Sequence, residues 1–260
     1  MDSDSSLTER VRTAHGDAWQ AEGRLREPYG GGAAELPGVR LMASGIPHPQ
    51  WNNGDVTDPA LVDLAAVSGW YAERGMPWGV RVPAGTAWPH GRLLFRKRCM
   101  GLRAADYRGV PPPVGVRLVA AGPDDLATYA ATDAGAFGDP VELTTRWVAP
   151  HLAGAEGFVA AIAYLGDEPV GVATAVRTSS TGAGDCVGVF GVGVLEHARR
   201  RGLGAALTSY VVSWGIESGA DLAWLNPDTD DAARIYARMG FVETDGFDIY
   251  VDVAASATNR

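Results

Sequence analysis

The feature that most constrains the fold is a strand, a glycine-rich turn and a helix in succession. Residues 186–194 are continuously apolar and mostly small, as expected of a strand at the centre of a sheet. The sequence then reads Arg-Arg-Arg-Gly-Leu-Gly at 199–204, and an amphipathic stretch with helical spacing runs from Leu203 to Glu217. This order predicts a mixed α/β fold in which the turn joins a buried strand to a long helix.

The turn at 199–204 has three properties that favour an anion site. Its glycines allow a ligand to approach the backbone closely. The start of the following helix leaves amide groups unpaired at the positive end of the helix dipole. Three adjacent arginines add positive charge to a chain whose formal net charge is −9. These properties predict a pyrophosphate site, and the alternative is a basic connection without a ligand.

The rest of the sequence predicts further helices and strands. Ser6 and Glu9 have the spacing of a capping box, which favours a helix start there. Gly166-Asp167 lies between two apolar runs and indicates a hairpin. Helices are expected at residues 6–24, 59–74, 92–99, 123–134, 140–152, 203–217 and 230–239. Strands are expected at residues 39–43, 77–82, 116–120, 158–164, 170–176, 186–194, 222–225 and 247–253.

Three consecutive prolines, Pro111 to Pro113, divide the chain. They lack amide donors and keep the backbone extended, so they predict a stiff linker. We expect an accessory domain at residues 1–110, the linker at 111–113 and a catalytic domain at 114–260. The turn pattern Arg/Gln-x-x-Gly-x-Gly/Ala does not occur before the linker, so the first domain is expected to have no second anion site of this kind.

Composition and charge exclude several classes of function. The 260 residues are 46% hydrophobic, which is enough for a sizeable core, and the 31 acidic residues outnumber the 22 basic ones. Nucleic acid and membrane are therefore not expected as partners. Two separated cysteines and five scattered histidines have no metal-ligand spacing, so no metal is expected. The charged N-terminus and the absence of an apolar run near the ~20 residues of a membrane span predict a cytoplasmic protein.

Two segments resemble the GNAT superfamily of acyl-CoA-dependent N-acetyltransferases. Residues 194–204 are similar to the end of the family's central strand and its CoA pyrophosphate loop. Residues 233–241, with Tyr236 and the closing Gly240-Phe241, are similar to its penultimate helix. The order of elements after Pro113 matches that fold. The resemblance implies an α/β (α+β) GNAT fold with a mixed, mostly antiparallel central sheet flanked by helices, and a second, degenerate GNAT-like N-terminal domain as in tandem members.

The resemblance also implies roles for individual residues. The backbone amides from Arg200 to Ala205 would hold the CoA pyrophosphate. The backbone of Val192 to Val194 would pair with pantetheine, and an amide there would polarise the acetyl carbonyl. Tyr236 would protonate the departing thiolate as general acid. The cofactor-binding residues implied in this way are Val192, Gly193, Val194, Arg199, Arg200, Arg201, Gly202, Leu203, Gly204, Ala205, Asn226 and Ala233.

The sequence does not identify the general base. Glu142 is the candidate carried forward, with Asp139, Glu196 and a water relay as alternatives, because each of these acids also suits the start of a helix. The chain departs from the family pattern at Glu196, where proline is common. It departs again at Thr229, where asparagine is common, and the nearby Asn226 is the candidate substitute.

Taken together, these residues predict direct transfer of acetyl from acetyl-CoA to a primary amine of a small molecule. The protein is expected to be a monomer or a homodimer. Two alternatives remain. One is an N-acetyltransferase acting on proteins or peptides, and the other is a CoA-binding sensor without catalytic activity.

Overall fold

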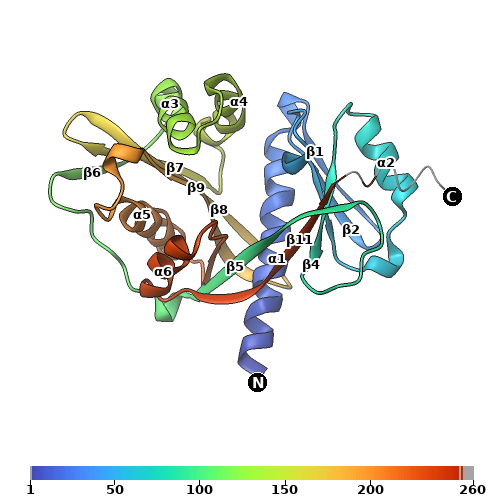
Figure 1. Ribbon diagram of the computed structural model, residues 1–260. Helices are drawn as coiled ribbons and strands as arrows, with labels where there is room; N and C mark the ends of the chain where they lie inside the picture. Colours follow the sequence, from blue (N-terminus) through green and yellow to red (C-terminus); the bar gives the residue numbers. More distant parts are fainter. Residues whose placement is uncertain (1, 252, 254–260) are drawn as a thin grey trace. The chain divides into compact units, whose positions relative to one another are not determined.

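The computed structural model describes residues 2–251 and 253, which form two compact units (Figure 1). The first unit comprises Met1–Cys99 with Thr244–Arg260, and the second comprises Met100–Glu243. This division differs from the boundary expected at 111–113, because residues 100–113 pack with the second unit and the last strand returns to the first. Within the described part of the chain, no helix is both long and apolar enough to cross a membrane.

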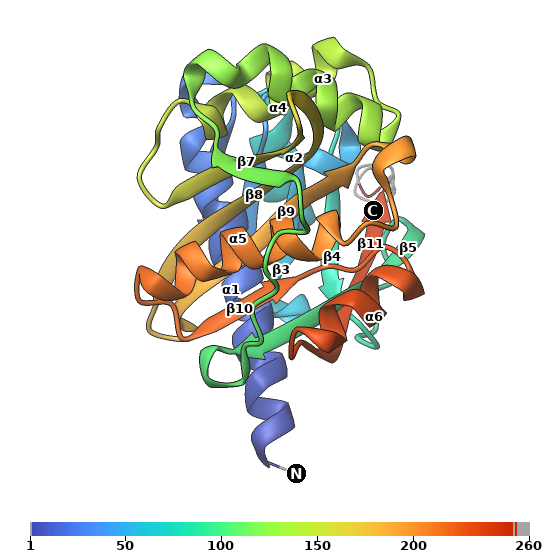
Figure 2. The same cartoon turned by 90° about the vertical axis from the view of Figure 1, so that its left-hand side faces the viewer.

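The second unit is a mixed sheet with helices on both faces (Figure 2). Its strand order is β5-β10-β9-β8-β7-β6, in which β9 and β10 are parallel and the other neighbours antiparallel. Helices α3 and α4 lie over one face, and α5 and α6 over the other (Figure 1). The strands are β5 Arg92–Arg103, β6 Val116–Ala120, β7 Phe158–Leu165, β8 Glu168–Ser180, β9 Gly184–Val194 and β10 Leu222–Leu225. The helices are α3 Leu126–Phe137, α4 Val141–Leu152, α5 Leu203–Glu217 and α6 Asp230–Arg238.

Helix α5 and the central strands share the main core of this unit. Leu203, Leu207 and Val211 recur at helical spacing, and each is at most 2% exposed. Gly215 allows the helix to lie close to β9, because a Cβ there would be 2.5 Å from the Cβ of Val187. The packing of α5 on β9 therefore fixes where the helix begins relative to the end of the strand.

The proline segment is docked on α5. The hydroxyl of Tyr107 lies 2.6 Å from Ser209 Oγ, and the amide of Val110 donates to the same oxygen at 2.8 Å. Pro113 reaches the start of the helix, where its Cγ is 3.4 Å from the position that a Cβ of Gly202 would take. The segment is thus part of the second unit rather than a free spacer.

In the first unit, helix α1 packs against this unit's part of the sheet. Its strand order is β1-β2-β3-β4-β11, with β3 and β4 parallel and α2 between them in the chain. Leu7, Val11, Ala14 and Ala18 give α1 a buried face at helical spacing. The elements are α1 Asp2–Leu25, β1 Gly32–Leu36, β2 Val39–Ala43, β3 Asn53–Val56, α2 Leu64–Ala72, β4 Gly79–Pro83 and β11 Val242–Val251. Short 3-10 helices over the whole chain are η1 Glu27–Tyr29, η2 Pro49–Trp51, η3 Pro59–Leu61, η4 Ala104–Asp106, η5 Pro123–Asp125 and η6 Glu196–Ala198.

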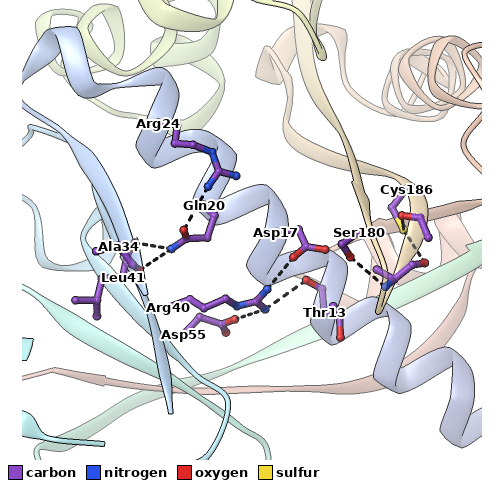
Figure 3. Close-up of polar contacts among 12 residues, drawn as sticks. Thr13, Asp17, Gln20, Arg24, Ala34, Arg40, Leu41, Asp55, Ser180 and Cys186 are labelled. Carbon is purple, nitrogen blue, oxygen red and sulfur yellow. Dashed lines mark hydrogen bonds and ion pairs between the residues drawn. The ribbon is translucent and has the colours of Figure 1, made fainter. Parts of the chain in front are cut away.

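Polar side chains fasten α1 to this sheet (Figure 3). Arg40 of β2 pairs with Asp17 of α1 at 2.7 Å and with the buried Asp55 of β3 at 2.9 Å. Gln20 donates to carbonyl oxygens of β1 and β2 at 3.1 and 2.7 Å. Burial raises the pKa of Asp55, and the guanidinium of Arg40 opposes that rise. Because a buried charge is costly without its partner, the position of α1 depends on this network.

Gly16 is the point where α1 passes the Arg40–Asp55 pair. A Cβ at Gly16 would overlap the guanidinium of Arg40 and the carboxylate of Asp55. Alanine exceeds glycine in helix propensity by about 1 kcal/mol, but overpacking costs about 1–3 kcal/mol. We therefore expect Gly16→Ala to lower the Tm measured by circular dichroism. Gly69 of α2 is the matched control, since its Cβ position is open; Gly69→Ala should keep or raise the Tm, and equal responses of the two variants would contradict the packing argument.

Two helix expectations in the first unit are wrong in detail. Helix α1 begins at Asp2, so Ser6 lies inside the helix and the expected capping box does not form its start. The helix expected at 59–74 is divided into η3 and α2. Asp58 caps the first piece through the amide of Ala60, and Asp63 caps the second.

The strands differ from the sequence prediction more than the helices do. Residues 92–99, expected to be helical, form the first part of β5. This strand has β11 and β10 as its neighbours in the sheet, and strand pairing overrides the helix propensity of its Leu, Arg and Lys residues. The short, glycine-containing β1 and β3 are absent from the sequence prediction. Strand β11 begins at Val242 rather than at 247, and residue 252 of its expected end lies outside the described residues.

Candidate functional site

Strands β9 and β10 are paired over only the first part of β9. Their parallel register runs from Cys186 opposite Leu222 to Val189 opposite Leu225. β10 ends at Leu225, whereas β9 continues to Val194. From Gly191 to Val194, no described strand pairs with the edge of β9 that faces β10, so this edge can accept another extended chain. The expected residues Val192, Gly193 and Val194 all lie on this part of the strand.

A β-bulge interrupts β9 at the same level. Val172 of β8 is paired with Gly193, whereas Thr174 of β8 is paired with Phe190. Residues 191–192 thus oppose a single residue of β8, which is the definition of a bulge. Bulges re-aim side chains and bend the strand that carries them.

The bulge reverses which side chains face α5. Gly191 has a φ of +54°, a left-handed conformation that glycine adopts without strain. Val187 and Val189 before the bulge, and Val192 and Val194 after it, all contribute to the core beneath α5. The side chains of the exposed end of β9 are therefore held in the core while its backbone edge stays available.

The loop after β9 is held in shape by the side chain of Arg199. Its Nε donates to the carbonyl oxygen of Val194 at 2.9 Å, and its Nη2 donates to the carbonyl oxygen of Ala136 at the end of α3, also at 2.9 Å. Arg200 has a φ of +66°, and it is the one non-glycine residue within 2–251 and 253 with a positive φ. Gly202 follows with a φ of +81°. Left-handed residues in such a loop turn successive amides toward one point, an arrangement that binds anions.

The loop leads into α5 without a side-chain cap. Gly202 is the N-cap, and its carbonyl oxygen accepts the first helical hydrogen bond, from Ala206 at 3.0 Å. The amides of Leu203, Gly204 and Ala205 precede that bond and point out of the helix end. A Cβ at Gly204 would meet no atom within 4 Å. The start of α5 therefore offers both amide donors and space.

Tyr236 of α6 is connected to the same helix. Its hydroxyl is hydrogen-bonded to Thr208, whose own hydroxyl donates to the carbonyl oxygen of Gly204 at 2.9 Å. Burial raises the pKa of Tyr236 to about 12; the hydrogen bond with Thr208 opposes this rise and the charge of Asp228 adds to it. The phenol therefore stays protonated at neutral pH, which is the form that a general acid needs.

The other expected cofactor-binding residues lie near this region with different degrees of exposure. Asn226 directly follows β10 and is half-buried, and Ala233 lies on the buried face of α6 in the core beneath α5. Thr229, which departs from the family pattern, caps α6 by accepting the amide of Ala232 at 3.1 Å. Threonine is a good N-cap, so the helix start is satisfied without asparagine.

The three acids considered as general base are all exposed. Glu142 lies in the first turn of α4, Asp139 in the turn before it, and Glu196 in η6. The structure gives none of them a buried position beside the open end of β9.

Sequence reasoning missed a partly buried acid next to the bulge. Asp133 is the one charged residue of α3, and its Oδ1 is 4.0 Å from the position that a Cβ of Gly191 would take, with Thr174 Oγ1 at 3.7 Å. Burial raises the pKa of Asp133 to about 7, and the charge of Asp139 adds to the rise. A single acid in an otherwise uncharged helix is the signal that could have identified it.

A strand that parts from its parallel neighbour beside a bulge, followed by an amide-lined helix start, defines the second unit as a GNAT-type acyltransferase fold. A GCN5-related N-acetyltransferase from Kribbella flavida is 21% identical, with a TM-score of 0.68 over 92% of this chain and 95% of that chain. A putative GNAT-family acetyltransferase from Novosphingobium aromaticivorans DSM 12444 is 16% identical, with a TM-score of 0.60 over 94% and 96%. A tandem GNAT protein from the clavulanic acid biosynthesis pathway is 16% identical, with a TM-score of 0.54 over 83% and 78%. These structures confirm the expected fold class.

The family is shown by the sequence itself. The family model described as "Probable histone acetyltransferase Rv0428c C-terminal" matches residues 55–247, which is most of the chain. This protein therefore belongs to that family of GNAT acyltransferases. Comparison with curated proteins gives no match.

Proposed function

We propose that this protein transfers the acetyl group of acetyl-CoA to a primary amine by direct attack of the amine on the thioester. The observation that supports the proposal is that three features lie around α5 in the second unit. These are the open edge of β9 at 192–194, the amide-lined loop at 199–204 and the protonated Tyr236. Membership of an acetyltransferase family supports the same reaction.

Each feature has one task in the proposed reaction. The amides of residues 200–205 bind the pyrophosphate of acetyl-CoA, and the edge of β9 at 192–194 pairs with the pantetheine arm. An amide of that strand donates a hydrogen bond to the acetyl oxygen, where negative charge develops during attack. As the new C–N bond forms and the C–S bond breaks, Tyr236 gives its proton to the departing thiolate.

The first candidate acceptor is a small-molecule amine, and the chain's net charge of −9 favours one that is cationic. The second candidate is the side chain of lysine in a basic protein. The description of the family as a probable histone acetyltransferase favours this second candidate. Both acceptors present a primary amine that must lose a proton before it attacks.

An assay of thiol release from acetyl-CoA tests the proposal and separates the acceptors. Spermidine, tyramine, kanamycin and a lysine-rich histone tail peptide serve as probes, compared by kcat/KM. A preference for one of the small amines supports the first acceptor, and a preference for the peptide supports the second. If acetyl-CoA binds but no probe releases thiol, the acetyl-transfer proposal fails and the CoA-sensor alternative replaces it.

Gly204 provides a direct test of the acetyl-CoA site. Its Cβ position is open, so leucine should fit the free protein, but its side chain would occupy the space over the start of α5. We expect Gly204→Leu to weaken acetyl-CoA binding about 100-fold, or about 2.7 kcal/mol, in calorimetry while the Tm stays unchanged. Gly69→Leu is the matched control, a helix glycine of the first unit with an equally open Cβ. Unchanged binding by Gly204→Leu would refute the location of the pyrophosphate.

A further inference from the structure

We infer that Asp133 is the general base that accepts a proton from the acceptor amine. The inference rests on the proposed acetyl transfer and supplies the residue that the sequence leaves open. It assigns the acceptor amine to the α3 side of β9, beside the bulge.

The position of Asp133 is the first argument. Helix α3 packs on β8 and β9, and the Asp133 carboxylate meets the sheet where residues 191–192 bulge. The next residues of β9, 192–194, are those whose free edge is proposed to bind the pantetheine arm. The carboxylate therefore lies beside the stretch of backbone that would hold the thioester, and the residue keeps part of its surface exposed.

The Asp133 carboxylate also makes no structural interaction with the described part of the chain. Among the described residues, its carboxylate has no hydrogen-bond or ion-pair partner. It lies in the C-terminal half of α3, away from the helix start where the dipole would stabilise a negative charge. An unpaired acid in such a place costs stability, and a stability cost retained at one position is typical of a functional site.

The surrounding charges favour a base that works near neutral pH. Asp139, in the turn after α3, is the neighbour whose charge raises the pKa of Asp133 beyond the effect of burial. Tyr129, one turn earlier on α3, is buried and hydrogen-bonded to Thr174. Helix α4 carries Glu142, Arg146 and His151, and the loop after β9 carries Arg199, and none of these acts on the carboxyl. The pKa of about 7 is close to the optimum for proton transfer at neutral pH.

The proposed reaction releases one proton to solvent for each acetyl group transferred. An acceptor ammonium gives one proton to the Asp133 carboxylate, which releases it to solvent. The amine nitrogen then forms a bond to the acetyl carbon, and the C–S bond breaks. The nitrogen loses a second proton, again to Asp133. Tyr236 gives its own proton to the thiolate, and the proton that Asp133 holds then reprotonates Tyr236. The products are the N-acetylated amine, the CoA thiol and one proton in solution.

The test uses the amine that gives the highest wild-type rate in the thiol-release assay, from about pH 5 to about pH 9. We expect Asp133→Asn to lower kcat/KM about 100-fold or more at pH 8 and to abolish the fall in rate below the pKa of the base. The Kd for acetyl-CoA should stay unchanged. Asp167→Asn, an exposed acid in the β7–β8 turn, is the matched control and should behave as wild type.

A measurement of stability separates catalysis from structure. Because the folded-state pKa of Asp133 is raised, its ionisation destabilises the protein as pH rises through about 7. Asp133→Asn removes that cost, so its Tm at pH 8 should equal or exceed that of wild type. Loss of activity together with a lower Tm at pH 8 would indicate a structural role and overturn the inference.

Asp139→Asn gives an independent result that does not depend on the folding of Asp133→Asn. Removing this like charge lowers the pKa of Asp133, so the acidic limb of kcat/KM should move to lower pH while the maximal rate is kept. A limb that does not move overturns the inference, as does wild-type activity of Asp133→Asn. If the wild-type protein acetylates none of the probes, the proposed function fails and this inference fails with it. If the wild type is active and Asp133→Asn is equally active, only the inference fails.

Discussion

Tyr236→Phe is expected to lower kcat at least about 100-fold while the Kd for acetyl-CoA stays unchanged. The substitution removes one oxygen and keeps the ring, which packs against the core beneath α5. Without the phenolic proton, the departing thiolate must be protonated by water. The interaction is needed only as the C–S bond breaks, so the loss should fall on kcat rather than on binding. Steady-state kinetics with calorimetry for acetyl-CoA measure both quantities.

Tyr210→Phe is the matched control for this substitution. Tyr210 of α5 is another partly buried tyrosine against the same core, and it lies outside the proposed mechanism. Its variant should retain the wild-type kcat. Because the pKa of Tyr236 is raised to about 12, the rate should also show no decline from ionisation of Tyr236 up to about pH 9. Equal rates for wild type and Tyr236→Phe would contradict its role as the acid.

The second prediction concerns which fragment of the chain can fold by itself. A fragment of residues 114–260, the domain that the sequence predicts, is expected to lack a cooperative unfolding transition. It loses the end of β5 that pairs with β10, including Met100 and Leu102, both at most 2% exposed. Losing large core side chains costs about 2–5 kcal/mol each, against a total stability of about 5–15 kcal/mol for a domain.

A fragment of residues 100–243 provides the comparison. It follows the observed division and keeps both the β5 end and the docked proline segment. We expect it to unfold cooperatively by circular dichroism and to bind acetyl-CoA. The structural division would be contradicted if 114–260 unfolded cooperatively and 100–243 did not.

The parts of the site that the sequence predicts are those that depend on neighbouring residues. The start and end of α5, the extent of β10 and the end of β9 follow from apolar periodicity and glycine position, and the structure has them at Leu203–Glu217, Leu222–Leu225 and Val194. The GNAT fold is predicted by the loop at 199–204 together with the segment around Tyr236. Both motifs are continuous in sequence, so a single chain displays them.

The features that the sequence does not predict depend on contacts between segments that are far apart in the chain. Residues 92–99 are a strand because of what they meet in space, and not because of their own propensity. Arg199 is expected among the cofactor-binding residues, and the sequence does not predict that its guanidinium donates to carbonyl oxygens of β9 and α3. The pKa of Asp133 is raised mainly by burial, where α3 packs on β8 and β9, and further by the charge of Asp139. The first two relations have no short-range signature, and for Asp133 the sequence displays only that it is the one charged residue of its helix.

The return of β11 to the first unit has a consequence for synthesis on the ribosome. β4 is made before the second unit, Met100–Glu243, yet its partner from Phe247 to Tyr250 is translated only after that unit. Until then the edge of β4 exposes unpaired amide and carbonyl groups, which are a template for pairing with another chain. The first unit therefore begins to be synthesised before the second but can complete its strands only after it, and a nascent chain stalled before residue 247 should be prone to aggregation through this edge.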